Sequence, residues 1–281
     1  MVMAVTIIKS SGQQEEFLTK KLAESLMRSG APPEVALDIA RQVEAKIPPA
    51  SHTKAIFRLA KRMLRKHNAV SGMKYSLKNA LSALGPSGYP FEKYIARILR
   101  VYGYEVEVDK IIKGYCVNHE VDVYGRKGNE HCVIECKYHS GGGNPADIKI
   151  ALYVHARFED IRKAYEANSE KGPLLQGWLV TNTRCTTDAI KYAECTGLKI
   201  VSWRYPERGS LEKIIEEKRL YPVTLLPSAR KKALDSLFRN DIIMAQEIAD
   251  MDEPTFLKKS GLDSESASLI KKEADAICPC S

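Results

Sequence analysis

The chain has 281 residues, of which 44% are hydrophobic and 28% are charged, and 43 basic against 35 acidic residues give a formal net charge of +8. This composition excludes a globally disordered chain, and no run approaches the roughly 18 apolar residues that cross a bilayer. The first residues lack a secretory pattern and the seven cysteines form no disulfide framework, so we expect a cytoplasmic protein without a membrane partner. The positive charge indicates a polyanionic partner.

The first 84 residues predict a small and mostly helical domain. Pro32-Pro33 favours the start of a helix, and Pro48-Pro49 separates that helix from the next one. The predicted elements are a short β-like run over residues 5–9 and helices over residues 19–29, 33–46 and 53–67.

The third of these helices carries an unusual excess of positive charge. Between Glu44 and Glu92 the sequence has no acidic residue, and nine lysines and arginines stand there. Apolar residues recur at helical spacing from Ile56 to Met63, which leaves a cationic opposite face. A solvated helix surface is the alternative, but uncompensated cations favour phosphate contact, with a nucleotide or with DNA. The candidate nucleic-acid contacts are Arg58, Lys61, Arg62, Arg65 and Lys66.

A breaker sequence, GPSGYP at residues 85–90, marks the next boundary, and from about 86 to 225 helix and strand patterns alternate. Pro90 opens a helix that Gly103 closes, and Glu92 lies at the edge of its apolar stripe. The later predicted elements are a strand over 104–108, hairpin arms over 120–124 and 131–138, a helix over about 145–168, a strand over 177–181, a helix over 187–195 and a strand over 198–203.

The hairpin is expected to bring charged side chains together. By strand alternation Asp122, Glu135 and Lys137 can share one face of the sheet. Two carboxylates so close are costly to bury without a partner, and a divalent cation such as Mg²⁺ would resolve this. Lys137 could then orient or deprotonate a water, or stabilise charge on the phosphate. Asn182 follows a core strand, where its amide could contact phosphate or water, or cap the next helix.

These motifs resemble a known enzyme superfamily. Asp122, followed after twelve residues by Glu135-Cys136-Lys137, resembles the core of the PD-(D/E)xK nucleases. The flanking sequences GYPFEKYIARILRVYGYEV, HEVDVYG and VIECKYH are similar to the Mrr-like restriction endonuclease branch over roughly residues 86–205, although Val121 stands where the superfamily name has proline.

The resemblance implies an αβββαβ core with a mixed sheet and Mg²⁺-dependent hydrolysis of DNA phosphodiesters, with Mn²⁺ as a possible substitute. It implies that Asp122 and Glu135 bind the metal, that Lys137 is the catalytic lysine and that Glu92 is an accessory acidic residue. Cutting both strands would need two such sites, so we expect a homodimer. A surface salt bridge between Lys137 and either carboxylate is the alternative interpretation.

The N-terminal segment resembles an ATP-cone, a small regulatory nucleotide-binding domain. The resemblance rests on VTIIKSSG at residues 5–12, on Phe17 and on TKAI at residues 53–56 with Tyr75, although Ser10-Ser11 replace the usual basic and polar or acidic pair. It implies ATP or another adenine nucleotide as effector. A helical domain that presents its basic face to DNA is the alternative. The candidate phosphate contacts are Lys9, Lys20 and Lys21.

The C-terminal part contains helical apolar spacing only. The stretches at residues 241–245 and 256–262 loosely resemble a helix-hairpin-helix module, whose turn amides bind DNA phosphates. A packing or dimerisation appendage is the alternative.

The sequence therefore predicts three domains, 1–84, 86–225 and 226–281, in an α/β protein: an ATP-cone-like domain, a restriction-endonuclease-like core and a helical tail. We expect a metal-dependent DNA endonuclease of restriction or defence type, with possible nucleotide regulation. The alternative function is a non-catalytic DNA or nucleotide sensor that uses a nuclease-like platform.

Overall fold

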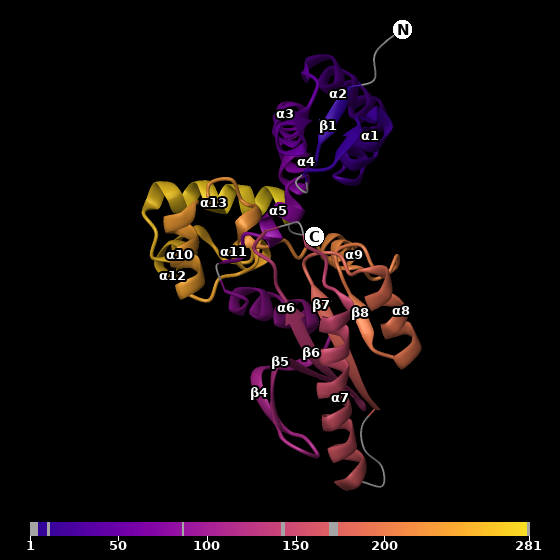
Figure 1. Ribbon diagram of the computed structural model, residues 1–281. Coiled ribbons are helices and arrows are strands. Elements are labelled where there is room, and N and C mark those ends of the chain that lie inside the picture. Colours follow the sequence, from indigo (N-terminus) through magenta and orange to yellow (C-terminus); the bar gives the residue numbers. More distant parts are fainter. Residues whose placement is uncertain (1–4, 10–11, 86, 142–143, 169–173, 280–281) are drawn as a thin grey trace. The chain divides into compact units, whose positions relative to one another are not determined.

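The computed structural model describes residues 5–9, 12–85, 87–141, 144–168 and 174–279 (Figure 1). The chain divides into two compact units: unit 1 comprises Met1–Leu77 with Leu225–Pro227, and unit 2 comprises Lys78–Thr224 with Ser228–Ser281. The division into three domains stays a prediction. None of the helices within the described ranges is long and apolar enough to cross a membrane.

Unit 1 combines a small sheet with helices. Strand β1 pairs with β2 antiparallel and with β3 in parallel, and the helices that the sequence predicts are present. The sequence missed β2 and β3, because strands of three and two residues are too short for an alternating pattern. The elements are β1 (Thr6–Ile8), β2 (Gln14–Glu16), α1 (Thr19–Arg28), α2 (Pro33–Lys46), β3 (Ser51–His52), α3 (Thr53–His67) and α4 (Ala69–Lys74).

Helix α3 packs as an amphipathic helix. Ile56, Ala60 and Leu64 are buried in the core of unit 1, and Leu59 and Met63 are partly buried against it. The five predicted cationic contacts lie on the other faces: Lys61 is half-buried, whereas Arg58, Arg62, Arg65 and Lys66 are exposed.

Unit 2 is built on a five-stranded mixed sheet of order β4-β5-β6-β7-β8. The first three strands are antiparallel, and β6, β7 and β8 are parallel. This confirms the mixed sheet that the sequence predicts. The strands are β4 (Glu105–Lys113), β5 (Asn118–Lys127), β6 (Glu130–Lys137), β7 (Leu174–Thr181) and β8 (Lys199–Val201), and the helices among them are α5 (Leu77–Leu81), α6 (Tyr89–Val101), α7 (Ile148–Asn168), α8 (Thr187–Thr196) and α9 (Leu211–Lys218).

Several boundaries differ from the prediction, and two of the differences have a clear cause. Strand β4 continues to Lys113 instead of ending at Val108, because its ladder with β5 runs on to Asn118. Helix α7 begins at Ile148, since the Asp147 carboxylate accepts hydrogen bonds from the backbone N–H groups of Lys149 and Ile150 at 3.0 and 3.3 Å.

Helix α7 lies along the sheet (Figure 1) and packs tightly on it. Phe158 and Ile161 of α7 form a buried cluster with Tyr124 and Val133 of the hairpin. A side chain on Gly177 of β7 would meet the Phe158 ring, because a Cβ there would lie 2.6 Å from its Cγ. The sheet and α7 therefore approach as closely as a glycine allows.

Gly177→Ala is expected to lower the free energy of unfolding by about 2 kcal/mol, because the added methyl group overpacks a ring that is fixed in the core. Urea denaturation of the full chain measures this. Gly141→Ala is the matched control, since nothing lies within 4 Å of a Cβ at that position. Equal stability of the two variants would contradict the tight packing of α7 on β7.

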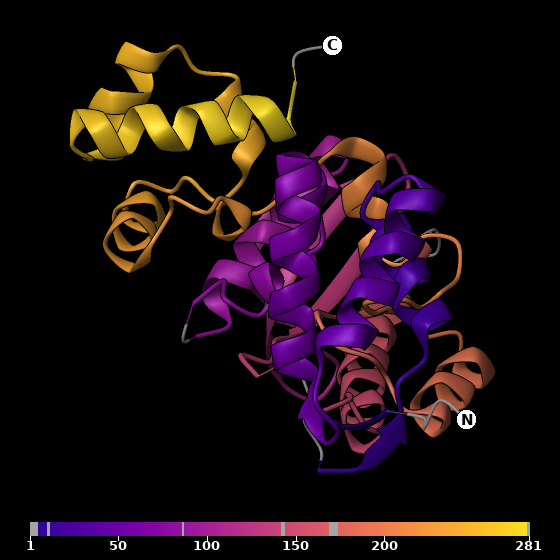
Figure 2. The same ribbon diagram turned by 90° about the horizontal axis from the view of Figure 1, so that it is seen from above.

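The tail is helical, as the sequence predicts, and its helices gather in one cluster (Figure 2). Gly261, at a φ of 66°, ends the third of them, and the Asp263 carboxylate caps the fourth by accepting from the Ser266 N–H at 2.8 Å. The helices are α10 (Lys231–Arg239), α11 (Ala245–Ala249), α12 (Glu253–Ser260) and α13 (Ser264–Ile277).

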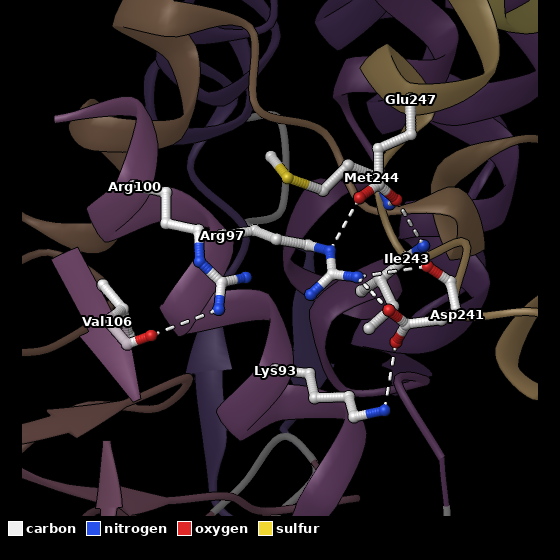
Figure 3. A network of polar contacts seen from close by, with 8 residues as sticks. All are labelled: Lys93, Arg97, Arg100, Val106, Asp241, Ile243, Met244 and Glu247. Carbon is white, nitrogen blue, oxygen red and sulfur yellow. Dashed lines mark hydrogen bonds and ion pairs between the residues drawn. The ribbon is translucent and has the colours of Figure 1, made fainter. Parts of the chain in front are cut away.

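Charged contacts join this tail to helix α6 within unit 2 (Figure 3). The Arg97 guanidinium donates to Asp241 Oδ2 at 2.5 Å and to Glu247 Oε1 at 2.6 Å, and Lys93 Nζ lies 3.0 Å from Asp241 Oδ1. Glu247 also accepts from the backbone N–H groups of Ile243 and Met244. The helix that bears Glu92 is therefore tied to the tail by two cations and two carboxylates.

Candidate active site

Asp122 and Glu135 lie side by side on strands β5 and β6. The ladder pairs Val123 with Ile134, so the two carboxylates occupy the next opposed positions, just beyond the last paired residues of the two strands. Beyond the last pair of the ladder, the Asp122 side chain connects β5 to β6, because its Oδ2 accepts a hydrogen bond from the Cys136 N–H at 2.7 Å. The structure thus brings this predicted carboxylate pair together.

Burial and mutual repulsion favour the protonated forms of these carboxyls. Desolvation, and then the Asp122 charge, raise the pKa of Glu135 to about 7 against the opposing effect of Arg157. Desolvation also raises the pKa of Asp122, although the hydrogen bond from Cys136 opposes it. Two half-buried carboxylates that repel each other form a place with a high affinity for positive charge.

Glu92 reaches the same group of charges from α6. Desolvation, and then the Asp122 charge, raise its pKa to about 7, and Glu135 contributes to the rise. Gly88 leaves room for this carboxylate, since a Cβ on Gly88 would lie 2.9 Å from Glu92 Oε1. The Glu92 carboxyl is therefore coupled electrostatically to the two strand carboxylates.

Lys137 ends strand β6 and is exposed. Its charge lowers the pKa of Glu135, so the ammonium acts on the same site. The next residue, Tyr138, fixes the position of the strand end. Its hydroxyl donates hydrogen bonds to the carbonyl oxygens of Ser82 and Gly85 at 2.7 and 3.0 Å. Its ring packs on the ring of Phe91, with 5.6 Å between the centroids. Lys137 is therefore presented to solvent from a firmly anchored segment.

The sequence reasoning missed Arg157, the ion-pair partner of Glu135. Arg157 Nη1 of α7 lies 2.5 Å from Glu135 Oε2. A signal was available, because Arg157 falls three residues after Val154 and four before Ile161, on the apolar stripe of its helix. A charged residue on such a stripe needs a buried partner of opposite charge.

The donor set fits a divalent cation of the Mg²⁺ type. Among the described residues no three or more His, Cys, Asp or Glu side chains gather as a ligand group. Mg²⁺ does not need such a group, because proteins hold it through one or two carboxylates while waters and substrate phosphates complete its octahedron. Asp122 and Glu135 supply those two carboxylates.

Asn182 is fully buried and holds the backbone beyond Lys137. Its Oδ1 accepts from the His139 N–H at 2.9 Å, and its Nδ2 donates to the His139 carbonyl at 2.8 Å. The cap of the next helix is Thr186 instead, whose side chain accepts from the Ala189 N–H. Both ends of the Asn182 amide are thus engaged, and its predicted contact with phosphate stays a prediction.

Two of the three predicted nucleotide contacts of unit 1 pair with the same carboxylate. Lys9 and Lys21 lie 2.7 and 3.4 Å from Glu15, while Lys20 lines a cleft of about 540 Å³ with residues of α1 and α2. Ser10-Ser11, where the sequence departs from the ATP-cone pattern, lie outside the described residues.

The cations of α3 have no such partner. Within the described ranges no carboxylate forms an ion pair with any of the five predicted nucleic-acid contacts on this helix. Arg62 and Lys66 also line a cleft of about 740 Å³ with residues of α2, which include the carboxylates Glu34 and Asp38. The cations of this face that form no ion pair can still contact an external anion.

Comparison with known proteins supports the prediction of a restriction-endonuclease-like domain in unit 2. Residues 85–205 match the family model described as a restriction endonuclease (Mrr type), and residues 221–278 match the model described as AF1548-like, C-terminal. An uncharacterized protein of Archaeoglobus fulgidus is 34% identical over 183 residues, which are 65% of this chain and 99% of that protein. Neither family match includes any residue before 85.

Two solved structures are also similar to the chain. The crystal structure of AF1548, described as a protein of unknown function, has 33% sequence identity and a TM-score of 0.57 and covers 68% of this chain and 98% of that one. A repair endonuclease from Pyrococcus abyssi has 23% identity and a TM-score of 0.31 over 41% of this chain and 46% of that one.

Proposed function

The chain belongs to the AF1548-like family and carries an Mrr-type restriction endonuclease domain, and from this premise we propose that it is a metal-dependent DNA endonuclease. The domain match indicates a nuclease, and the proposal adds the metal, the substrate and the residues. The observation that carries it is that Asp122, Glu135 and Lys137 come from the adjacent strands β5 and β6 next to the point where these strands stop pairing, with the Glu92 carboxyl coupled to them electrostatically.

Each of these side chains has a task in the proposed reaction. Asp122 and Glu135 hold Mg²⁺ (or Mn²⁺), which when bound supplies positive charge to the phosphate oxygens. Lys137 Nζ orients the attacking water, or takes its proton, and stabilises charge on the phosphate. Glu92 is an accessory acceptor whose raised pKa lets it hold or release a proton near neutral pH.

Plasmid cleavage by the full chain tests the proposal. We expect supercoiled DNA to be nicked or linearised with Mg²⁺ or Mn²⁺ and to stay intact with EDTA. Glu135→Gln is the control for a contaminating nuclease, because it removes one carboxylate charge and keeps the shape of the side chain. Cleavage that survives in Glu135→Gln, or an inactive wild-type protein at every metal concentration tried, would refute the proposal.

The basic face of α3 favours a second candidate function, a non-catalytic DNA sensor. Its exposed cations have no acidic partners among the described residues and fit the phosphate backbone. A sensor of this kind would bind DNA with a steep dependence on salt, without metal and without cleavage. Binding that is retained in EDTA while the DNA stays intact in Mg²⁺ would favour the sensor.

We also propose two finer features for unit 1 and for assembly. Unit 1 would act as an ATP-cone-like regulator, with Lys9, Lys20 and Lys21 near the nucleotide phosphates. Two copies of the chain would pair to cut both strands of a duplex, because one site cuts one strand. Equilibrium dialysis with labelled ATP, and sedimentation of the protein with and without DNA, measure these features separately.

A further inference from the structure

The Glu135 carboxylate already has a positively charged partner within the protein, the guanidinium of Arg157. Arg157 Nη1 lies 2.5 Å from Glu135 Oε2, and the two side chains are only 17% and 23% exposed. The Arg157 charge also acts on Asp122, where it opposes the rise of the pKa. One guanidinium thus partly neutralises both carboxylates that would hold a divalent cation.

We propose that Arg157 is a built-in counter-ion of this metal site, which competes with the metal for Glu135 and, once displaced, contacts a phosphate of the DNA. The inference rests on the proposed nuclease function. It adds a residue from a fourth element, helix α7, to a site otherwise made by β5, β6 and α6.

Competition follows from the geometry of Glu135. Its Oε2 is taken by Arg157, so a metal that binds through this oxygen must break a charge-assisted hydrogen bond. The pair lies at a small pocket that is otherwise mostly apolar and includes Val133, Val154 and Phe158. Because both side chains are little exposed, the attraction between Arg157 and Glu135 is strong, and an unpaired charge in this pocket would be costly. A positive charge, either Arg157 or a metal ion, is therefore favoured beside Glu135.

The surroundings of Arg157 suit a second position of its guanidinium at the solvent-exposed surface. Its guanidinium carbon lies 5.4 Å from the centroid of the Tyr153 ring, and Tyr153 is 57% exposed. The side chain therefore has an aromatic support that reaches solvent. A planar guanidinium binds phosphate oxygens in a two-point contact, which makes arginine the suitable residue for such an exchange.

Metal titration of the full chain without DNA tests the competition. Mn²⁺ binding, followed by electron paramagnetic resonance of the free ion, needs no catalytic activity. In Arg157→Gln we expect a Kd about tenfold lower than in the wild type, because the competitor is gone. The matched control is Arg162→Gln on the same helix, whose partners are the surface residues Glu159 and Glu166, and its Kd should equal that of the wild type.

Arg157→Gln also distinguishes the two proposed roles of the guanidinium, as the counter-ion of Glu135 and as a contact to a DNA phosphate. Despite its tighter metal binding, Arg157→Gln should cleave plasmid about tenfold or more slowly than the wild type at saturating Mn²⁺, because the phosphate contact is lost. Arg157→Lys keeps the charge without the planar fork, so both effects should be smaller. It serves as the test variant if Arg157→Gln does not fold, as judged by circular dichroism.

The outcomes distinguish this inference from the proposed function. An unchanged or higher Kd in a folded Arg157→Gln or Arg157→Lys, with metal binding still lost in Glu135→Gln, refutes the counter-ion and leaves the nuclease proposal standing. Failure of the wild-type protein to bind Mn²⁺ at all refutes both.

Discussion

Lys137→Met is expected to lower the rate of plasmid cleavage by about 1,000-fold. Methionine keeps the length and the apolar part of the side chain but removes the ammonium that would orient water and stabilise the phosphate. The exposed position of Lys137 at the end of β6 means that folding should not suffer. Single-turnover cleavage of a supercoiled plasmid at saturating Mg²⁺ measures the effect on the chemical step.

The control for this experiment is Lys191→Met on α8, an exposed lysine outside the candidate active site, which should cleave at the wild-type rate. Mn²⁺ affinity should change little in Lys137→Met, since the ammonium is not a metal ligand. A variant that cleaves within threefold of the wild-type rate would remove Lys137 from the mechanism and would favour the surface salt-bridge interpretation.

Metal affinity is expected to rise about 30-fold between pH 5.5 and pH 8. The pKa of Glu135 is raised to about 7, so this carboxyl is about 3% ionised at the lower pH and about 90% at the higher one. A metal competes with that proton, and binding near pH 6.5 should release protons into the buffer. Calorimetric titration with Mn²⁺ in buffers of different ionisation enthalpy measures both the affinity and the number of protons.

The same carboxyls give the metal-free protein a pH-dependent stability. In the folded state the pKa values of Glu135 and Glu92 lie above the unfolded value of 4.5, so the folded state binds more protons between pH 4.5 and about 7. Their contribution to stability therefore falls as the pH rises through this window. Bound metal should offset the loss, so the increase in Tm on adding Mg²⁺ should be larger at pH 8 than at pH 5.5. An equal increase at both values would contradict the raised pKa values.

The shared face of the hairpin residues was predictable from strand alternation. The pattern around residues 120–138 predicts that Asp122 and Glu135 lie on one face of the sheet, and the structure adds the longer strands and the register that sets these two residues opposite each other. The helices of unit 1 and of the tail were predictable for a similar reason, since their apolar spacing is regular.

Other parts of the site depend on long-range packing. Arg157 reaches Glu135 across 22 positions of sequence, and Asn182 reaches His139 across 43. No local pattern specifies which buried charge meets which partner, because the approach of α7 to the sheet decides it. The cationic face of α3, by contrast, could be predicted from the distribution of charge alone.

The junction between α6 and the tail has a consequence for how this protein can be dissected. Arg97, only 16% exposed, draws its carboxylates from beyond residue 240, so a chain truncated before them would leave a mostly buried cation without a partner five residues from Glu92 on the same helix. Trimming the C-terminus to isolate a minimal nuclease would consequently disturb the acidic centre itself, and any loss of cutting in such a fragment would say nothing about DNA contacts made by the removed helices.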